Sequence, residues 1–264
     1  MGPIVFPLLP IFSEESFPPP AFALTFFHLI YVAMEQSSQK SDHPPAQAVH
    51  HEWRTAENSA VFVLAKLQSM KEMNPNLTLL DVGAGSGTIS VTFAKAVPDG
   101  HVTAIDLNPD ILPRARANAE MAGIKNIEFQ QGDAYKLPFA DGTFDITFCH
   151  QMLTHLKAPW DALSEMLRVT KPGGTVAARE GDLETECVWP ESSGLLKFHR
   201  FAAGTMNAAG GTSTGGRQLL SWALKAGAER KQITVSYSTW SYSTPSDKKA
   251  WGKSPVPLDC STWI

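Results

Sequence analysis

A glycine-rich turn in the first third of the chain carries residues that could bind a nucleotide-type ligand. The turn contains Gly83, Gly85 and Gly87, and Asp81 precedes it. Glycines let backbone N–H groups approach a ligand closely. The third glycine of a dinucleotide-binding turn is missing, because Thr88 stands at its place. Asp81 suits an ammonium group better than a phosphate, which favours S-adenosylmethionine (SAM), a zwitterionic cofactor without phosphate.

Two more carboxylates end strands that the sequence predicts. Asp106 closes the next strand, 19 residues after Gly87, where a carboxylate can accept both hydroxyls of a ribose. We include its neighbour Leu107 among the cofactor contacts. Asp133 and Ala134 follow a third strand and would lie near an adenine amino group. Together these residues predict a nucleoside site at one edge of a parallel sheet.

Two histidines, His150 and His155, lie at and just beyond the end of the fourth predicted strand. A neutral imidazole there could take a proton from a hydroxyl that accepts a methyl group. Structural roles stay open for both: His150 as a hydrogen-bond partner of the cofactor or backbone, and His155 as a helix-surface residue. We expect no metal, because no third ligand falls at suitable spacing.

The elements that would position these residues alternate between strand and helix. This pattern predicts an α/β fold, a doubly wound, mostly parallel Rossmann-like sheet of about seven strands with helices on both faces. The later elements expected are strands Ile127–Gln131, Phe144–His150, Thr175–Arg179 and the edge strand Gln232–Tyr242, and helices Ile89–Ala96, Pro159–Val169, Phe198–Met206 and Gln218–Ala226. A first helix is expected over Thr55–Leu67.

Composition limits the partners. The 264 residues carry a net charge of −4, which argues against nucleic acid and for a small-molecule substrate. Three irregularly spaced cysteines indicate a reducing compartment, and we expect a cytoplasmic protein. The sequence leaves the oligomeric state open.

The two ends of the chain differ from its middle. We expect a poorly ordered extension and linker over residues 1–50, a ligand-binding domain over 51–251 and an atypical tail over 252–264. The apolar run 21–34 would span roughly 21 Å as a helix, short of a bilayer core of about 30 Å. We therefore expect no stable membrane insertion.

Several motifs together resemble class I SAM-dependent methyltransferases, and more narrowly the UbiE-type branch of ubiquinone and menaquinone biosynthesis with its natural-product relatives. The resemblance runs from about His51 to Trp251. The matching segments are Arg54–Ala60, Leu80–Gly87, Gly132–Ala134 with Leu137–Phe139, His150–Leu156, Arg168–Gly174 and Gly216–Trp222.

The resemblance implies a role for residues that the spacing alone does not assign. It places Arg54 and Asn58 beside the SAM site, and it implies a mid-sized, partly aromatic metabolite as methyl acceptor, in secondary-metabolite or quinone-like biosynthesis. Two alternatives remain: a SAM-binding homologue with impaired or no catalysis, suggested by the unusual termini, and an NAD(P)-dependent oxidoreductase. The oxidoreductase would need the missing third glycine and a hydride-site pair such as Tyr-x-x-x-Lys.

Overall fold

A computed structural model describes residues 52–189, 191–241 and 244–245 of the chain. The expected N-terminal extension (1–50) and tail (252–264) lie outside these residues, as does the apolar run 21–34. Within the described part, no helix has the length and apolar character needed to cross a membrane. The elements that follow all belong to the segment expected as the ligand-binding domain.

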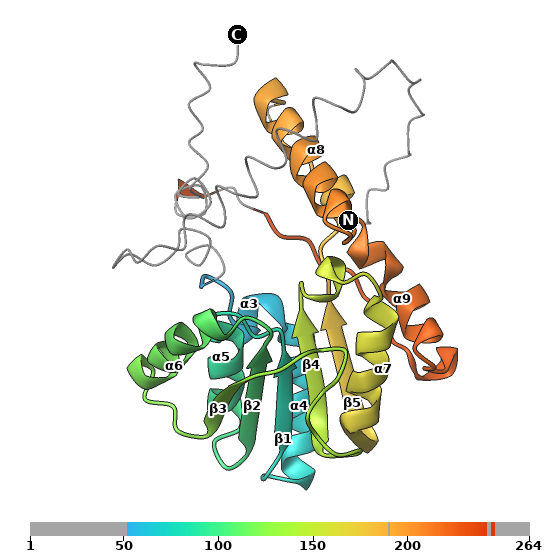
Figure 1. Cartoon of the computed structure of the whole chain (residues 1–264). Coiled ribbons are helices and arrows are strands. Elements are labelled where there is room, and N and C mark those ends of the chain that lie inside the picture. Colours follow the sequence, from blue (N-terminus) through green and yellow to red (C-terminus); the bar gives the residue numbers. More distant parts are fainter. Residues whose placement is uncertain (1–51, 190, 242–243, 246–264) are drawn as a thin grey trace, which may run out of the picture. The chain divides into compact units, whose positions relative to one another are not determined.

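One parallel sheet forms the centre of the fold (Figure 1). Its strand order is β3-β2-β1-β4-β5, and every neighbouring pair is parallel. The strands are β1 (Thr78–Val82), β2 (His101–Asp106), β3 (Ile127–Gln131), β4 (Phe144–His150) and β5 (Thr170–Arg179). The predicted α/β parallel sheet is confirmed, but the described residues form five strands rather than about seven.

The predicted edge strand Gln232–Tyr242 is one source of this difference. Residues 233–241 have no regular secondary structure. Their alternating apolar side chains are largely exposed, with Val235 47% and Tyr237 88% accessible. Alternation favours a strand only where a neighbouring strand supplies backbone partners. Here side chains make the contacts instead: Arg179 donates to Ser238 Oγ at 2.9 Å.

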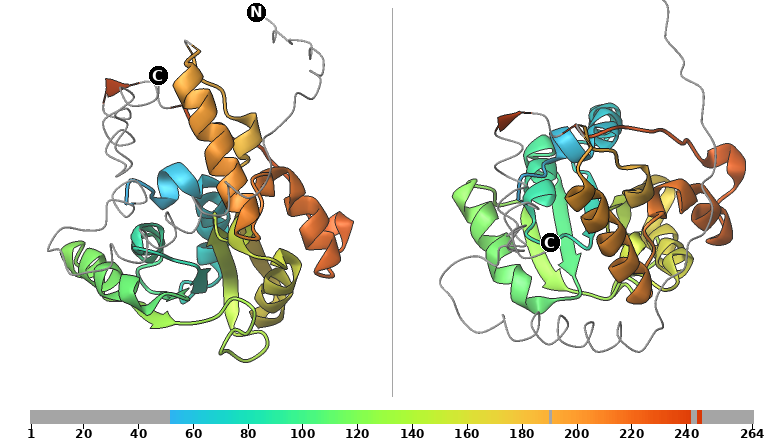
Figure 2. Two further views of the ribbon diagram at one scale, coloured as in Figure 1. Left: turned by 45° about the horizontal axis from the view of Figure 1, so that its top comes forward. Right: turned by 90° about the horizontal axis from the view of Figure 1, so that it is seen from above.

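Helices cover both faces of the sheet, as predicted (Figure 2). The α-helices are α3 (Ala56–Ser59), α4 (Val61–Met73), α5 (Thr88–Ala96), α6 (Leu112–Met121), α7 (Pro159–Val169), α8 (Ser193–Ala208) and α9 (Gly215–Lys225). Short 3-10 turns are η1 (Pro109–Ile111), η2 (Leu153–His155), η3 (Leu183–Thr185) and η4 (Arg230–Gln232). Helices α4 to α6 pack on one face, and α7 and α9 pack on the other.

Helix boundaries follow local signals where those are strong. Helix α7 has the predicted bounds, because Pro159 occupies its first turn and apolar residues recur along one side. The expected helix Thr55–Leu67 is instead two helices, α3 and α4, separated at Ala60, whose backbone is not helical (φ −142°). Helix α8 is longer than expected at both ends.

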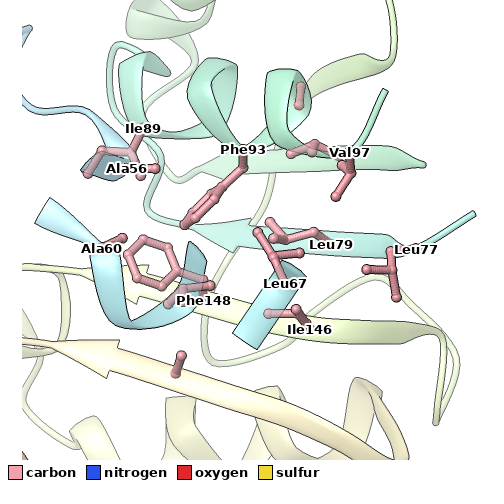
Figure 3. Packing of buried hydrophobic residues seen from close by; sticks show 14 residues of the cluster. Ala56, Ala60, Leu67, Leu77, Leu79, Ile89, Phe93, Val97, Ile146 and Phe148 are labelled. Carbon is pink, nitrogen blue, oxygen red and sulfur yellow. The ribbon is translucent and has the colours of Figure 1, made fainter. Parts of the chain in front are cut away.

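The larger core cluster fixes the strands that carry the site. Phe93 of α5 and Phe148 of β4 meet edge to face, with ring centroids 5.0 Å apart. Figure 3 shows the Phe93 side chain extending from its helix toward the sheet, with Phe148 and Leu79 in the same cluster. Truncating a buried phenylalanine typically costs about 3–5 kcal/mol. The carboxyl ends of β1 and β4 are therefore held in a fixed relation.

Candidate active site

Polar residues gather at the carboxyl edge of the sheet, where all five strands end on the same side. Open parallel sheets bind ligands at this edge, where the strand order reverses. The reversal lies between β1 and β4, because β2 and β3 extend the sheet in one direction and β4 and β5 in the other. Neighbouring strands are about 4.8 Å apart, so the site extends roughly 10–20 Å across the edge.

The glycine-rich turn between β1 and α5 leaves one open position. Gly83, Gly85 and Gly87 all have positive φ, of 77°, 55° and 74°. A Cβ on Gly87 would lie 2.6 Å from the ring of Phe129, and one on Gly83 would lie 2.5 Å from Met152. A Cβ on Gly85 would meet no atom within 4 Å. The outer glycines are therefore required by packing, and Gly85 is where a ligand can approach the backbone.

Asp106 ties this turn to the end of β2. Its Oδ2 accepts a hydrogen bond from the Gly85 N–H at 2.9 Å, and its Oδ1 accepts one from the Asn108 N–H at 2.9 Å. A carboxylate has about four lone-pair positions, so two remain for other donors. The neighbouring Leu107 is 65% exposed. The structure thus brings together the predicted turn and the predicted ribose-binding carboxylate.

Asp133 and Ala134 follow β3, on the same edge. Asp133 is exposed, and its Oδ1 accepts a hydrogen bond from the Tyr135 N–H at 2.9 Å. Ala134 is partly buried against the core. The carboxylate is therefore fixed by its own turn and keeps lone pairs for a ligand, as an adenine contact would need.

Asp81, which precedes the glycine-rich turn, is buried. Strand alternation puts it on the face covered by α5, where it is 3% exposed and accepts a hydrogen bond from Ser90 Oγ at 2.5 Å. Burial raises the pKa of Asp81 to about 7; the bond from Ser90 opposes this rise, and the charge of Asp106 adds to it. Asp81 thus lies beneath the turn and helix, rather than open at the edge.

His150 lies in a cluster of rings and guanidinium groups at the end of β4. Its buried ring stacks on Phe148, with centroids 6.4 Å apart, and the Trp240 ring lies 5.8 Å away. The guanidinium carbon of Arg179 is 4.3 Å from the centre of the Trp240 ring, and that of Arg54 is 5.6 Å from it. Such cation–π contacts are stabilising.

The cluster joins distant parts of the chain. Trp240 Nε1 donates to the carbonyl of Asn58 at 3.2 Å, and Trp53 meets the Trp240 ring edge on. The segment after α9 crosses over the carboxyl edge toward α3 (Figure 2). Sequence reasoning missed Arg179, although it pairs in register with His150 across β4 and β5. Predicting that Arg179 lies beside His150 requires knowing which residues of β4 and β5 pair.

His155 lies on η2, apart from this cluster. It lines an apolar hollow of about 340 Å³, together with residues of α8 that include Phe198, Phe201 and Met206. Partial burial, and then the positive charge of Arg54, lower the pKa of His155 below its usual value of 6.5. The imidazole is therefore neutral near pH 7 and could accept a proton.

Two carboxylates follow β5, and the structure separates their roles. Asp182 accepts two hydrogen bonds from Arg217 of α9, at 2.5 and 2.8 Å, which occupies it in an ion pair. Glu180 Oε1 instead accepts from the backbone N–H groups of Met152 and Leu153, at 3.0 and 2.8 Å. Burial raises the pKa of Glu180 to about 8.

Residues 73–209 match the family described as "Methyltransferase domain". The chain belongs to this family. Its methyl donor is SAM, which confirms the cofactor predicted from the glycine-rich turn. The oxidoreductase alternative is therefore set aside.

Individual relatives of this methyltransferase share different portions of it. An uncharacterised methyltransferase of Schizosaccharomyces pombe is 38% identical over 208 residues, covering 75% of this chain and 71% of the relative. The ubiquinone/menaquinone biosynthesis C-methyltransferase UbiE of Roseobacter denitrificans is 40% identical over 103 residues, 39% of this chain and 41% of that enzyme. A SAM-dependent methyltransferase of Aquifex aeolicus has 28% identity and a TM-score of 0.40, over 52% of this chain and 77% of that one.

The site of the methyltransferase fits SAM on two observations. The backbone at Gly85 is open to a ligand, and Asp106 beside it keeps acceptor capacity for the ribose hydroxyls. Among the described residues, no group of three or more His, Cys, Asp or Glu side chains could hold a metal ion.

Proposed function

We propose that this methyltransferase transfers a methyl group to a small, partly aromatic metabolite of secondary-metabolite or quinone-like biosynthesis, in the cytoplasm. The observation that carries the proposal is the apolar hollow beside η2. Phe198 and Phe201 line it, and His155 offers a polar group at the same place. Mostly apolar hollows with a few polar groups are typical small-molecule sites. The net charge of −4 favours a small molecule over nucleic acid.

The cofactor would lie along the carboxyl edge. We assign the ribose to Asp106, with Leu107 beside it, and the adenine to Asp133 and Ala134. These assignments follow from the order of the strands, since β2 and β3 are neighbours on one side of the glycine-rich turn.

The methionine end of the cofactor would then lie over the turn of Gly83, Gly85 and Gly87. Arg54, which is buried beside the Trp240 ring, is the candidate for its carboxylate. Asp81 beneath the turn would act on its ammonium group from the covered face. The reacting methyl group would point toward β4, where His150 lies.

SAM, when bound, supplies a methyl group activated by a sulfonium, so the protein mainly has to align the reactants and exclude water. If the acceptor is a hydroxyl, a base must take its proton. His155 suits that role better than His150 because it lines the hollow, and its lowered pKa keeps it neutral near pH 7. The imidazole of His155 would take the hydroxyl proton, while bound SAM would supply the methyl group.

The test is transfer of a trideuteromethyl group from labelled SAM to a panel of phenols, quinols and related aromatic metabolites, followed by mass spectrometry. A labelled product whose formation is lost in Asp106→Ala supports the proposal. SAM binding by calorimetry without transfer to any member would instead support a SAM-binding homologue without this catalysis. Absence of SAM binding would contradict the assigned cofactor site.

A further inference from the structure

Glu180 presents a buried carboxyl oxygen that the fold does not use. The residue follows β5 at the carboxyl edge of the sheet, one strand beyond His150. Its Oε1 accepts two backbone N–H bonds from the turn after β4. Its Oε2 is equally buried and has no hydrogen-bond partner among the described residues. Buried polar atoms are nearly always paired, so a ligand atom could supply the partner that the described residues do not.

The two N–H bonds determine where the proton of this carboxyl lies. Burial raises the pKa of Glu180 to about 8, although the backbone N–H groups of Leu153, Met152 and Thr154, and then the charge of Arg54, act in the opposite direction. The group is therefore mostly protonated at neutral pH. Oε1 faces two N–H donors and must therefore be the unprotonated oxygen. The proton is on Oε2, which makes that atom a hydrogen-bond donor. Its missing partner is an acceptor atom.

Glu180 is connected to the hollow assigned to the methyl acceptor through η2, because Leu153 of η2 donates to its Oε1. The turn that binds its Oε1 continues into η2, and His155 of η2 lines the hollow. Arg54 acts electrostatically on both Glu180 and His155. The candidates for the nucleoside, Asp106 and Asp133, lie on the other side of the glycine-rich turn, after β2 and β3. This arrangement favours the methyl acceptor over the nucleoside as the source of a ligand atom that reaches Glu180.

We propose that Glu180 recognises the methyl acceptor by donating a hydrogen bond from Oε2 to a carbonyl or phenolic oxygen of an otherwise apolar ring system. This inference rests on the proposed function, because it takes the hollow to be the acceptor site. It adds a requirement that an apolar hollow alone does not impose: the acceptor carries an oxygen with a free lone pair. Glu180 thereby selects oxygenated rings over plain hydrocarbons.

The experiment compares two probes of nearly equal shape, 1-tetralone and tetralin, by calorimetry on the protein saturated with S-adenosylhomocysteine. An apolar hollow without a donor favours tetralin, because the carbonyl of tetralone would lose its hydration without compensation. We expect the wild-type protein to bind tetralone about tenfold more tightly than tetralin. Glu180→Gln keeps an amide N–H donor, and we expect it to keep most of the preference.

Glu180→Ala removes the donor, and we expect tetralin to become the tighter ligand. A residue that only held the turn after β4 would change the affinity for both probes by the same factor. Glu72→Ala, an exposed carboxylate on α4, is the matched control and should behave as wild type. Unchanged binding of S-adenosylhomocysteine in each variant shows that the cofactor site is intact.

The inference is overturned if the wild-type protein fails to bind tetralone, if it shows no preference, or if Glu180→Ala keeps the preference. The binding experiment and the methyl-transfer assay can fail independently of each other. Methylated products with a preference independent of Glu180 would refute only the role of Glu180. A preference that depends on Glu180, without methylation of any compound in the panel, would refute only the proposed acceptor class.

Discussion

Replacing Asp81 by asparagine tests whether the fold keeps a protonated carboxyl beneath the glycine-rich turn. The side chain is 3% exposed, and its pKa is raised from 3.8 to about 7, mainly by burial. Asparagine has almost the same shape and can still accept the hydrogen bond from Ser90, but it never ionises. The variant therefore resembles the protonated wild-type side chain at every pH.

The sign of the effect follows from the raised pKa. Between pH 4 and 7 the unfolded chain has lost the Asp81 proton while the folded protein keeps it, so the free energy of unfolding falls as pH rises. The contribution is fully present below the unfolded pKa and is lost as pH rises through the folded pKa. Each unit of pH corresponds to about 1.36 kcal/mol. From pH 5 to 8, about two units lie below the folded pKa, which predicts a loss of roughly 3 kcal/mol.

Urea unfolding of both proteins, followed by circular dichroism at pH 5 and pH 8, measures this loss. We expect Asp81→Asn to gain about 3 kcal/mol relative to wild type between the two pH values. Comparing the two chains at each pH cancels the contributions of other groups, Glu180 included. Ser90→Ala removes the bond that favours the ionised form of Asp81. In a chain that keeps Asp81, it should therefore raise the pKa further and increase the loss of unfolding free energy between pH 5 and pH 8. An equal difference between wild type and Asp81→Asn at both pH values would refute the reasoning.

The remaining predictions concern the cofactor site and the base. Asp106→Ala should weaken SAM binding at least tenfold by calorimetry, because charge-assisted hydrogen bonds contribute about 1.5–3 kcal/mol each; an unchanged affinity would contradict the ribose assignment. Gly87→Ala places a Cβ 2.6 Å from Phe129 at a φ of 74°, so it should lower the melting temperature clearly more than Gly85→Ala, whose Cβ meets no atom within 4 Å. Gly85→Ala should mainly weaken SAM binding. Equal melting temperatures of the two variants would contradict these separate roles. His155→Ala should lower kcat by roughly 10²–10⁴ with little effect on SAM binding, and the wild-type rate should rise with pH through a titration below 6.5. If His150→Ala shows that loss and His155→Ala does not, the base is His150 instead.

Local signals in the sequence account for most of the elements and for most of the candidate cofactor site. Proline in the first turn and regular apolar spacing gave helix α7 its predicted bounds. Successive apolar segments separated by helices predicted a parallel sheet, and a parallel sheet brings Gly85 and Asp106 to one edge. These inferences succeed because backbone conformation and strand polarity depend mostly on residues close in the chain.

The same reasoning was wrong where the conformation of a segment depends on a partner elsewhere in the chain. The alternation in residues 233–241 resembles a strand, but no neighbouring strand pairs with it among the described elements. Its Trp240 instead contacts Arg54 and Arg179, and it bonds to Asn58, 182 positions earlier. A contact across that separation has no signature in local periodicity.

Tertiary structure alone decided what the buried carboxylates can do. The sequence placed Asp81 before the turn and Glu180 after β5, but it did not show which face of the sheet each side chain would occupy. Strand register and helix packing put Asp81 under α5 and directed Glu180 toward the turn after β4. Burial then raised both pKa values and left Glu180 Oε2 without a partner. Desolvation depends on every atom that surrounds a group, so it is a property of the folded chain and not of any segment of its sequence.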